Sequence, residues 1–209
     1  MKNNTKRKIL LLGGAVCYNF FVYCGGRQIA QDFHHYSFAI SFDDDIPVLP
    51  WTILIYCGAY LFWTVNYCLA TMYDRSGGDR FIMSHYIGEA ICFLSFILLP
   101  TTMARPGISG DSLFGHLLIF AYSVDSPDNL MPSIHCFASW LCWIGVRKNT
   151  RIPQWYQNTS LMIAIAICLS TLTVKQHVIM DVAAGILLAE LSYFIAGLGR
   201  PLKVSEQSI

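Results

Sequence analysis

Six apolar segments, each of roughly 20 residues, constrain the fold of this chain more than any other feature. A helix of about that length is needed to cross the hydrocarbon core of a bilayer. The linkers between the segments are too short to hold a soluble domain. We therefore expect an all-α membrane protein with six transmembrane helices and a single domain, residues 1–209. The predicted spans are 8–26, 48–72, 82–103, 131–147, 158–174 and 177–197.

The composition agrees with lipid as the main solvent. About 25% of the residues in a soluble domain are charged, whereas this chain has 13% charged and 55% hydrophobic residues. The net charge of +1 gives no reason to expect a nucleic acid partner. The eight cysteines lie in apolar stretches without a CxxC pair, which favours small buried side chains over a disulfide framework. The first apolar run leads into Gly25-Gly26-Arg27, so we expect no cleaved signal peptide.

Positive charge is distributed unevenly about the predicted spans. If the six spans alternate in direction, eleven of the fourteen Lys and Arg residues fall on one side of the membrane. That side is expected to be cytoplasmic, with both termini inside. The opposite, non-cytoplasmic side of the plasma membrane then holds Arg27, Arg105 and Lys175. The eleven cytoplasmic cations are Lys2, Lys6, Arg7, Lys8, Arg75, Arg80, Arg147, Lys148, Arg151, Arg200 and Lys203.

Three polar segments lie at the predicted outer ends of different helices. The first, 100–106, closes the third span. The second, 132–135, opens the fourth span, and the third, 175–181, joins the fifth span to the sixth. The six-span topology places all three on the same membrane face, although they are distant in the sequence.

His177 and Asp181 are spaced so that they share one face of a helix. An aspartate just inside a membrane helix needs a partner. An imidazole Nδ1–H is a suitable partner, and the carboxylate then leaves Nε2 free as a nucleophile. The structural alternative is an Asp–His pair that only holds the helix ends together.

His135 follows Pro132, a residue favoured in the first turn of a helix. The free amides of that turn and the Ser133 hydroxyl are suited to an anion. A histidine at this place can protonate a departing oxygen. The alternative is an isolated histidine at the membrane interface.

Arg105 and Lys175 are the cations nearest these histidines in the predicted topology. Arginine can bind two phosphate oxygens with its planar guanidinium, and lysine offers a compact point charge. Alternatively, each is an interfacial cation that reaches lipid headgroups. Together the residues predict a site for a lipid phosphate ester, with no metal and no cofactor.

Other polar residues have weaker indications. His116 lies in the predicted outer loop, where contact with the substrate is the less favoured interpretation. The run Asp43-Asp44-Asp45 indicates a cap for the second span or, alternatively, a cation site. Glu89 and Glu190 lie inside predicted spans, and we expect them to have polar partners on neighbouring helices. Arg27 has no assigned role.

The ordered motifs resemble those of the type 2 phosphatidic acid phosphatase superfamily, K-x6-R-P, P-S-x-H and S-R-x5-H-x3-D. Here they read Arg105-Pro106, then Pro132-Ser133-Ile134-His135, then Ser170-x6-His177-x3-Asp181. The resemblance covers all six predicted helices and implies the bundle of that family. It also implies that His177 forms a phosphohistidine assisted by Asp181 and that His135 protonates the leaving alcohol. Arg105, Ser133 and Lys175 would hold the phosphoryl oxygens.

Two positions depart from these motifs. Leu98 stands where the first motif has lysine, and Thr171 stands where the third has arginine. Lys175 is a candidate replacement for one lost cation. The altered motifs are closer to the branch that contains inositol phosphorylceramide synthases, whose members transfer a phospho-headgroup between lipids.

Three functions remain as hypotheses. The first is a lipid phosphatase acting on phosphatidic acid, phosphatidylglycerol phosphate or polyprenyl diphosphate. The second is a lipid phosphotransferase, in which an alcohol replaces water. The third is a non-catalytic membrane protein, which is less favoured because the charged residues gather at one face and no span is visibly broken.

Overall fold

The structure is a computed structural model that describes residues 2–72, 75–147 and 149–198. Within these ranges the regular elements are all helical, and only two isolated β-bridges accompany them. The elements are α1 (Lys2–Ala30), α2 (Ser41–Asp45), the 3-10 helix η1 (Pro50–Thr52), α3 (Ile53–Met72), α4 (Arg75–Leu98), α5 (Leu113–Val124), α6 (Ile134–Val146), α7 (Gln154–Thr173) and α8 (Ile179–Leu198).

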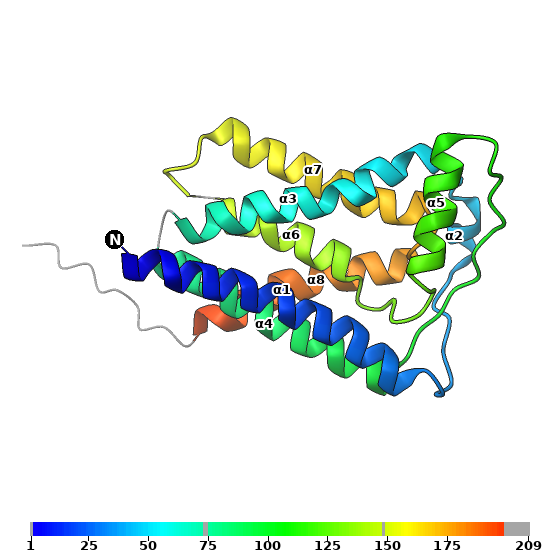
Figure 1. Ribbon diagram of the computed structural model, residues 1–209, viewed down its shortest axis with the longest axis horizontal. Coiled ribbons are helices and arrows are strands. Elements are labelled where there is room, and N and C mark those ends of the chain that lie inside the picture. Colours follow the sequence, from blue (N-terminus) through cyan, green and yellow to red (C-terminus); the bar gives the residue numbers. More distant parts are fainter. Residues whose placement is uncertain (1, 73–74, 148, 199–209) are drawn as a thin grey trace, which may run out of the picture.

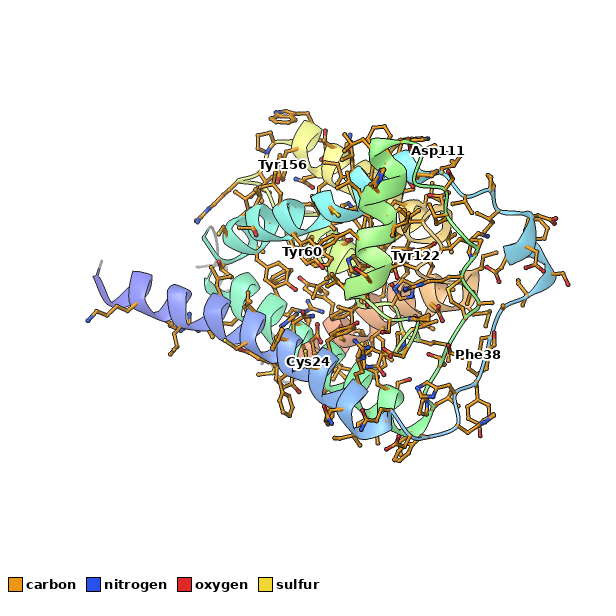
Figure 2. All side chains as sticks on the ribbon, turned by 45° about the vertical axis from the view of Figure 1, so that its right-hand side comes forward. Cys24, Phe38, Tyr60, Asp111, Tyr122 and Tyr156 are labelled. Atoms are coloured by element: carbon orange, nitrogen blue, oxygen red, sulfur yellow. The ribbon has the colours of Figure 1, made fainter. Side chains whose placement is uncertain are left out.

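The long helices form a bundle in which successive members run in opposite directions (Figure 1). They are α1, α3, α4, α6, α7 and α8, and each falls on one of the six apolar segments. Helix α6 lies inside the bundle and contacts α3, α4, α7 and α8. Helices α2 and α5 and the long connections lie together at one end, where α5 crosses the bundle (Figures 1 and 2).

Close helix packing around α6 explains why it is the most enclosed helix. Phe137, Leu141 and Ile144 are fully buried on it. Gly185 of α8 lies so near α6 that an added Cβ would stand 2.6 Å from the Ser133 carbonyl oxygen. Since only glycine permits that approach, α8 holds the N-terminus of α6 in a fixed position.

Three helices in the described part of the chain are long and apolar enough to cross a membrane: Pro50–Thr71, Gly77–Leu98 and Ile179–Leu198. Large apolar side chains are exposed along them, among them Leu61, Leu94 and Leu187, as expected of helices that face lipid. Helix α6 has 13 residues and is about 20 Å long. It is therefore shorter than the roughly 30 Å hydrocarbon core of a bilayer.

The boundaries predicted for the third span, 82–103, are wrong by several residues at each end. Helix α4 begins at Arg75 and ends at Leu98, because the residue before a proline disfavours helical geometry and Pro100 follows. At the other end, Arg80 precedes the predicted span but lies within α4. Its guanidinium donates to the Tyr193 carbonyl at 3.0 and 2.8 Å.

Helix α5 was not predicted. Its segment belongs to the outer loop predicted between the third and fourth spans, and its twelve residues are too few to cross a membrane. Ser112 caps it, with its hydroxyl accepting from the Gly115 amide at 3.0 Å. One face of α5 packs on the bundle through Leu118, which is fully buried.

The acidic residues within the helices have the expected partners. Glu190 accepts from the Arg147 guanidinium at 2.8 and 2.7 Å and from Trp140 Nε1 at 3.0 Å. Glu89 accepts from Asn19 Nδ2 at 2.7 Å, between α4 and α1. These contacts confirm that both carboxyl groups join neighbouring helices. Of the predicted cytoplasmic cations, Lys148, Arg200 and Lys203 lie outside the described residues.

The described cysteines are all free, and the predicted burial holds for half of them. Four of them, Cys92, Cys136, Cys142 and Cys168, are buried, whereas Cys17 and Cys57 are exposed on α1 and α3.

Candidate functional site

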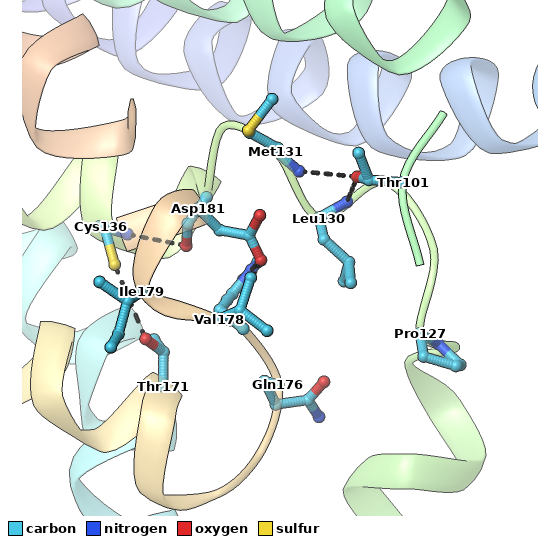
Figure 3. A network of polar contacts seen from close by, with 12 residues as sticks. Thr101, Pro127, Leu130, Met131, Cys136, Thr171, Gln176, Val178, Ile179 and Asp181 are labelled. Atoms are coloured by element: carbon cyan, nitrogen blue, oxygen red, sulfur yellow. Dashed lines mark hydrogen bonds and ion pairs between the residues drawn. The ribbon is translucent and has the colours of Figure 1, made fainter. Parts of the chain in front are cut away.

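The three predicted polar segments meet at one end of the bundle. The Thr101 hydroxyl accepts from the amides of Leu130 and Met131 at 2.9 and 3.0 Å, which joins the first segment to the second (Figure 3). The Ser133 amide donates to the Asp181 carbonyl at 3.1 Å, which joins the second to the third. The structure thus brings together segments that the sequence separates by up to 80 residues.

The His177–Asp181 pair forms as predicted from its spacing. His177 Nδ1 lies 3.3 Å from Asp181 Oδ2, and both residues are buried. The same oxygen accepts from the Val178 amide at 3.0 Å (Figure 3). Asp181 therefore caps the start of α8 and also orients the imidazole. The same carboxylate thus holds the helix end together and supports His177 as the proposed nucleophile.

The turn before His177 is a Schellman motif at the end of α7. The Gln176 amide donates to the Thr171 carbonyl at 3.0 Å, and the Lys175 amide donates to Leu172 at 3.1 Å. Lys175 occupies the left-handed position with φ 51°. The His177 amide also donates to Thr171, at 3.2 Å, so the end of α7 fixes where the nucleophile candidate lies.

His135 is enclosed by aromatic rings of α3. The Tyr56 ring stacks on it with centroids 4.2 Å apart and an interplanar angle of 18°. Trp63 and Tyr60 contact it with centroids at 5.1 and 5.9 Å. Its Nε2 is buried and has no hydrogen-bond partner in the described part of the chain. The ring is thus held by packing, and one nitrogen remains available to a ligand.

The two histidine rings face a shared region of the site. Their centroids are 6.5 Å apart with an interplanar angle of 53°. Reacting atoms stand about 3–3.5 Å apart in a near-attack arrangement. The separation brings both imidazoles to the same end of the bundle, within the span of one phosphate ester.

Arg105 supplies a half-buried cation that contacts Gln176, the residue before His177. Its guanidinium donates to the Asp125 carbonyl and to Gln176 Oε1 and lies over the Tyr122 ring, 4.6 Å from the centroid. Burial lowers the pKa of this guanidinium, and the nearby Asp125 carboxylate opposes the change. Arg105 remains charged, because an arginine is not deprotonated in proteins, and its Nε has no partner among the described residues.

Two of the predicted phosphate-binding residues form hydrogen bonds within the protein. The Lys175 ammonium donates to the Asp43 carbonyl of α2 at 2.7 Å. Ser133 is fully buried as the N-cap of α6, and its hydroxyl accepts from the Cys136 amide at 3.3 Å. Pro132 thus lies before the cap and not in the first helical turn, because Ser133 takes the cap. Of the two predicted cations, Arg105 is the one linked to His177, through its contact with Gln176.

His116 and the acidic run lie elsewhere. His116 Nδ1 contacts the Ser112 carbonyl of its own turn at 3.0 Å, on α5.

The predicted cap on the second span is wrong. Asp43 instead accepts from the amides of Ile179 and Ile40, both at 2.8 Å, and caps α8. It does so because α2 packs beside the turn that carries Lys175. The described residues hold no group of His, Cys, Asp and Glu side chains suited to a metal ion.

Sequence reasoning missed Asp125, Tyr56 and Gln176. Asp125 accepts from the Tyr23 hydroxyl and from the Tyr56 hydroxyl at 3.3 Å, and its carbonyl binds Arg105. Gln176 is 1% exposed and adjoins His177. Its position in the Lys-Gln-His run was the available signal, whereas nothing in the sequence links Tyr56 to His135.

Three buried polar atoms of the site lack a partner within the described chain: His135 Nε2, Arg105 Nε and Gln176 Nε2. Buried polar groups are normally satisfied, so this end of the bundle has donor capacity for a ligand. Two of the three atoms are N–H donors, which favours an anion. No family model, curated protein or solved structure matches the chain.

Proposed function

We propose that the chain is a membrane-integrated lipid phosphatase of the type 2 phosphatidic acid phosphatase kind, acting through a phosphohistidine. The observation that carries this proposal is the placement of the His135 and His177 rings 6.5 Å apart, with Asp181 behind His177. Arg105 and its unpartnered Nε support it by supplying a cation beside the same region. A dianionic phosphate is suited to such a set of donors.

In the first step His177 Nε2 attacks phosphorus. A bond forms between that nitrogen and phosphorus, and the ester P–O bond breaks. His135, protonated once the phosphate anion lies beside it, gives its proton to the leaving alcohol oxygen. Asp181 accepts from Nδ1–H and stabilises the positive charge that develops on the His177 ring.

In the second step the phosphohistidine is resolved. Neutral His135 takes a proton from water, and the water oxygen attacks phosphorus. The N–P bond breaks, which releases inorganic phosphate and returns His177 to its neutral form. Arg105 stabilises the phosphoryl oxygens in both steps, because it is fixed before the charge develops.

The proposed membrane placement follows from helix direction and charge. Six alternating helices would bring both ends of the bundle to membrane surfaces. The end with His135 and His177 carries Arg105 and Lys175, whereas the other holds most cations, including Arg7 and Arg147. By the positive-inside rule the site faces the non-cytoplasmic side of the plasma membrane. A lipid phosphate in the outer leaflet would then reach it.

Transfer to an alcohol is a second candidate, favoured by the two departures from the motifs. Leu98, at the position of the first motif's lysine, is 77% exposed on α4. Thr171, at the position of the third motif's arginine, caps α7 through its carbonyl. The site therefore holds fewer cations than the phosphatase motifs provide, and a singly charged phosphodiester would need fewer.

Purified protein supplied with radiolabelled phosphatidic acid or polyprenyl diphosphate tests the proposal. Release of inorganic phosphate in water alone is the expected result. Product formation only after an alcohol acceptor is added would favour transfer. Neither product, together with a His177→Ala variant that behaves like the parent, would leave only a non-catalytic membrane protein.

A further inference from the structure

Gln176 is a buried polar side chain that the two-histidine scheme leaves without a role. It is 1% exposed and directly precedes His177. Its backbone is fixed by the Schellman motif, in which its amide donates to the Thr171 carbonyl at 3.0 Å. Its side chain points away from the α7–α8 turn, toward the segment that carries Pro127 (Figure 3).

The contact with Arg105 sets the orientation of the Gln176 amide. A guanidinium donates and does not accept, so the atom facing it must be the amide oxygen. Oε1 accordingly accepts from Arg105 Nη2. Nε2 then faces the other way with two N–H donors, and no residue of the described chain accepts from it.

A buried NH2 group without an acceptor is energetically disfavoured. Arg105 Nε and His135 Nε2, at the same end of the bundle, are also buried without a partner among the described residues. A phosphoryl group between the two imidazoles would bring acceptor oxygens to these atoms. The three unsatisfied atoms thus have a common explanation in one anionic ligand.

We propose that Gln176 is a catalytic residue, whose Nε2 donates a hydrogen bond to a phosphoryl oxygen of the group attacked by His177. This inference rests on the proposed phosphoryl chemistry. Gln176 supplies a neutral donor near the place where Thr171 replaces the arginine of the third motif. It therefore compensates for the lost cation by hydrogen bonding without adding charge.

The alternative is that Gln176 only positions Arg105 through Oε1. A double-mutant cycle separates the two roles. Gln176→Met preserves the length of the side chain and removes both polar atoms. Its effect is measured in the parent and in the Arg105→Ala background, as kcat/KM for phosphatidic acid and as the rate of phosphohistidine formation in one turnover.

We expect Gln176→Met to lower kcat/KM by about 100-fold, as loss of a donor to a developing oxyanion does. In the Arg105→Ala background it should lower the remaining rate by at least tenfold more. The matched control Gln154→Met, at the exposed start of α7, should behave like the parent. A loss that disappears when Arg105 is absent, or parent-like activity of Gln176→Met, would overturn the donor role.

A second variant protects the test against misfolding. Gln176→Glu keeps the oxygen that accepts from Arg105 and removes the N–H donors, and thermal unfolding in detergent verifies its fold. We expect a loss at least as large as that of Gln176→Met, and parent-like activity would overturn the inference. If the parent itself forms neither phosphate nor phosphohistidine, the proposed function fails, and the role of Gln176 fails with it. If the parent is active and both Gln176 variants behave like it, only the role of Gln176 is contradicted, and the proposed function stands.

Discussion

Asp181 is the residue on which the chemistry and the local fold depend together. Its Oδ2 lies between His177 Nδ1 at 3.3 Å and the Val178 amide at 3.0 Å. A carboxylate held in this way selects the imidazole tautomer that leaves Nε2 free. The spacing predicted this contact through a shared helix face. His177 instead lies in the turn before α8, which begins at Ile179, and the contact forms where that turn enters the helix.

Asp181→Asn should preserve the shape of the site and remove the charge. We expect kcat to fall by about 10⁴-fold, as it does when an orienting carboxylate is replaced in a catalytic triad. The variant should still fold, which its thermal unfolding midpoint in detergent checks. Activity within a few fold of the parent would show that Asp181 serves only as the cap of α8.

The residues that sequence reasoning missed have a common physical reason. Tyr56 stacks on His135, and Asp125 and Gln176 bind Arg105, through tertiary contacts that no local spacing records. Lys175 and Ser133 illustrate the converse case. Their motif positions predicted phosphate contacts, whereas the structure places the Lys175 ammonium on the Asp43 carbonyl and Ser133 on the Cys136 amide.

At the scale of the elements, the end of α7 positions the site. The Schellman motif reverses the chain between Thr171 and His177. Its left-handed position is usually glycine, but here it is Lys175 with φ 51°. A non-glycine residue costs about 1–2 kcal/mol in that conformation. The lysine offsets part of this through its bond to α2.

Two substitutions at Lys175 measure the backbone strain. Lys175→Ala and Lys175→Gly both remove the ammonium, but only glycine adopts the left-handed conformation freely. We expect the glycine variant to be more stable than the alanine variant by about 1 kcal/mol, measured by unfolding in detergent micelles. Equal stability, or a more stable alanine variant, would contradict the strained turn.

The helix positions were predictable from apolar length, but their ends depended on features other than hydropathy. Pro100 ended α4 earlier than the apolar run suggested, and a pair between Arg7 and Asp79 accompanies its earlier start. Helix α5 was not predicted, because its twelve residues are too few to cross a membrane. A segment of that length between two predicted spans is indistinguishable from a loop by hydropathy.

At the scale of the whole molecule, alternating helices bring the polar segments to one end (Figure 1). The same arrangement was predicted from the six-span topology. The gathering of the polar segments at one end depends only on helix direction, so the sequence predicts it without any tertiary contact. The side of the membrane that this end faces is a prediction from charge distribution.

Cysteine accessibility tests that orientation. Ser109 is exposed in the connection before α5, and Thr150 is exposed in the loop between α6 and α7. These two connections lie at opposite ends of the bundle (Figure 1). A membrane-impermeant maleimide applied to intact cells should label Ser109→Cys above the level of the parent, whose free cysteines provide the background. Thr150→Cys should be labelled only after permeabilisation. The reverse pattern would place the histidine pair on the cytoplasmic side.

The covalent intermediate tests the central claim most directly. Protein incubated with substrate carrying ³²P in the reacting phosphoryl group, quenched in alkali and digested, should yield one labelled peptide with the phosphoryl group on His177. The label should be acid-labile, absent from His177→Ala and longer-lived in His135→Ala. A parent that releases phosphate without forming this intermediate, or a label that persists in His177→Ala, would contradict the account.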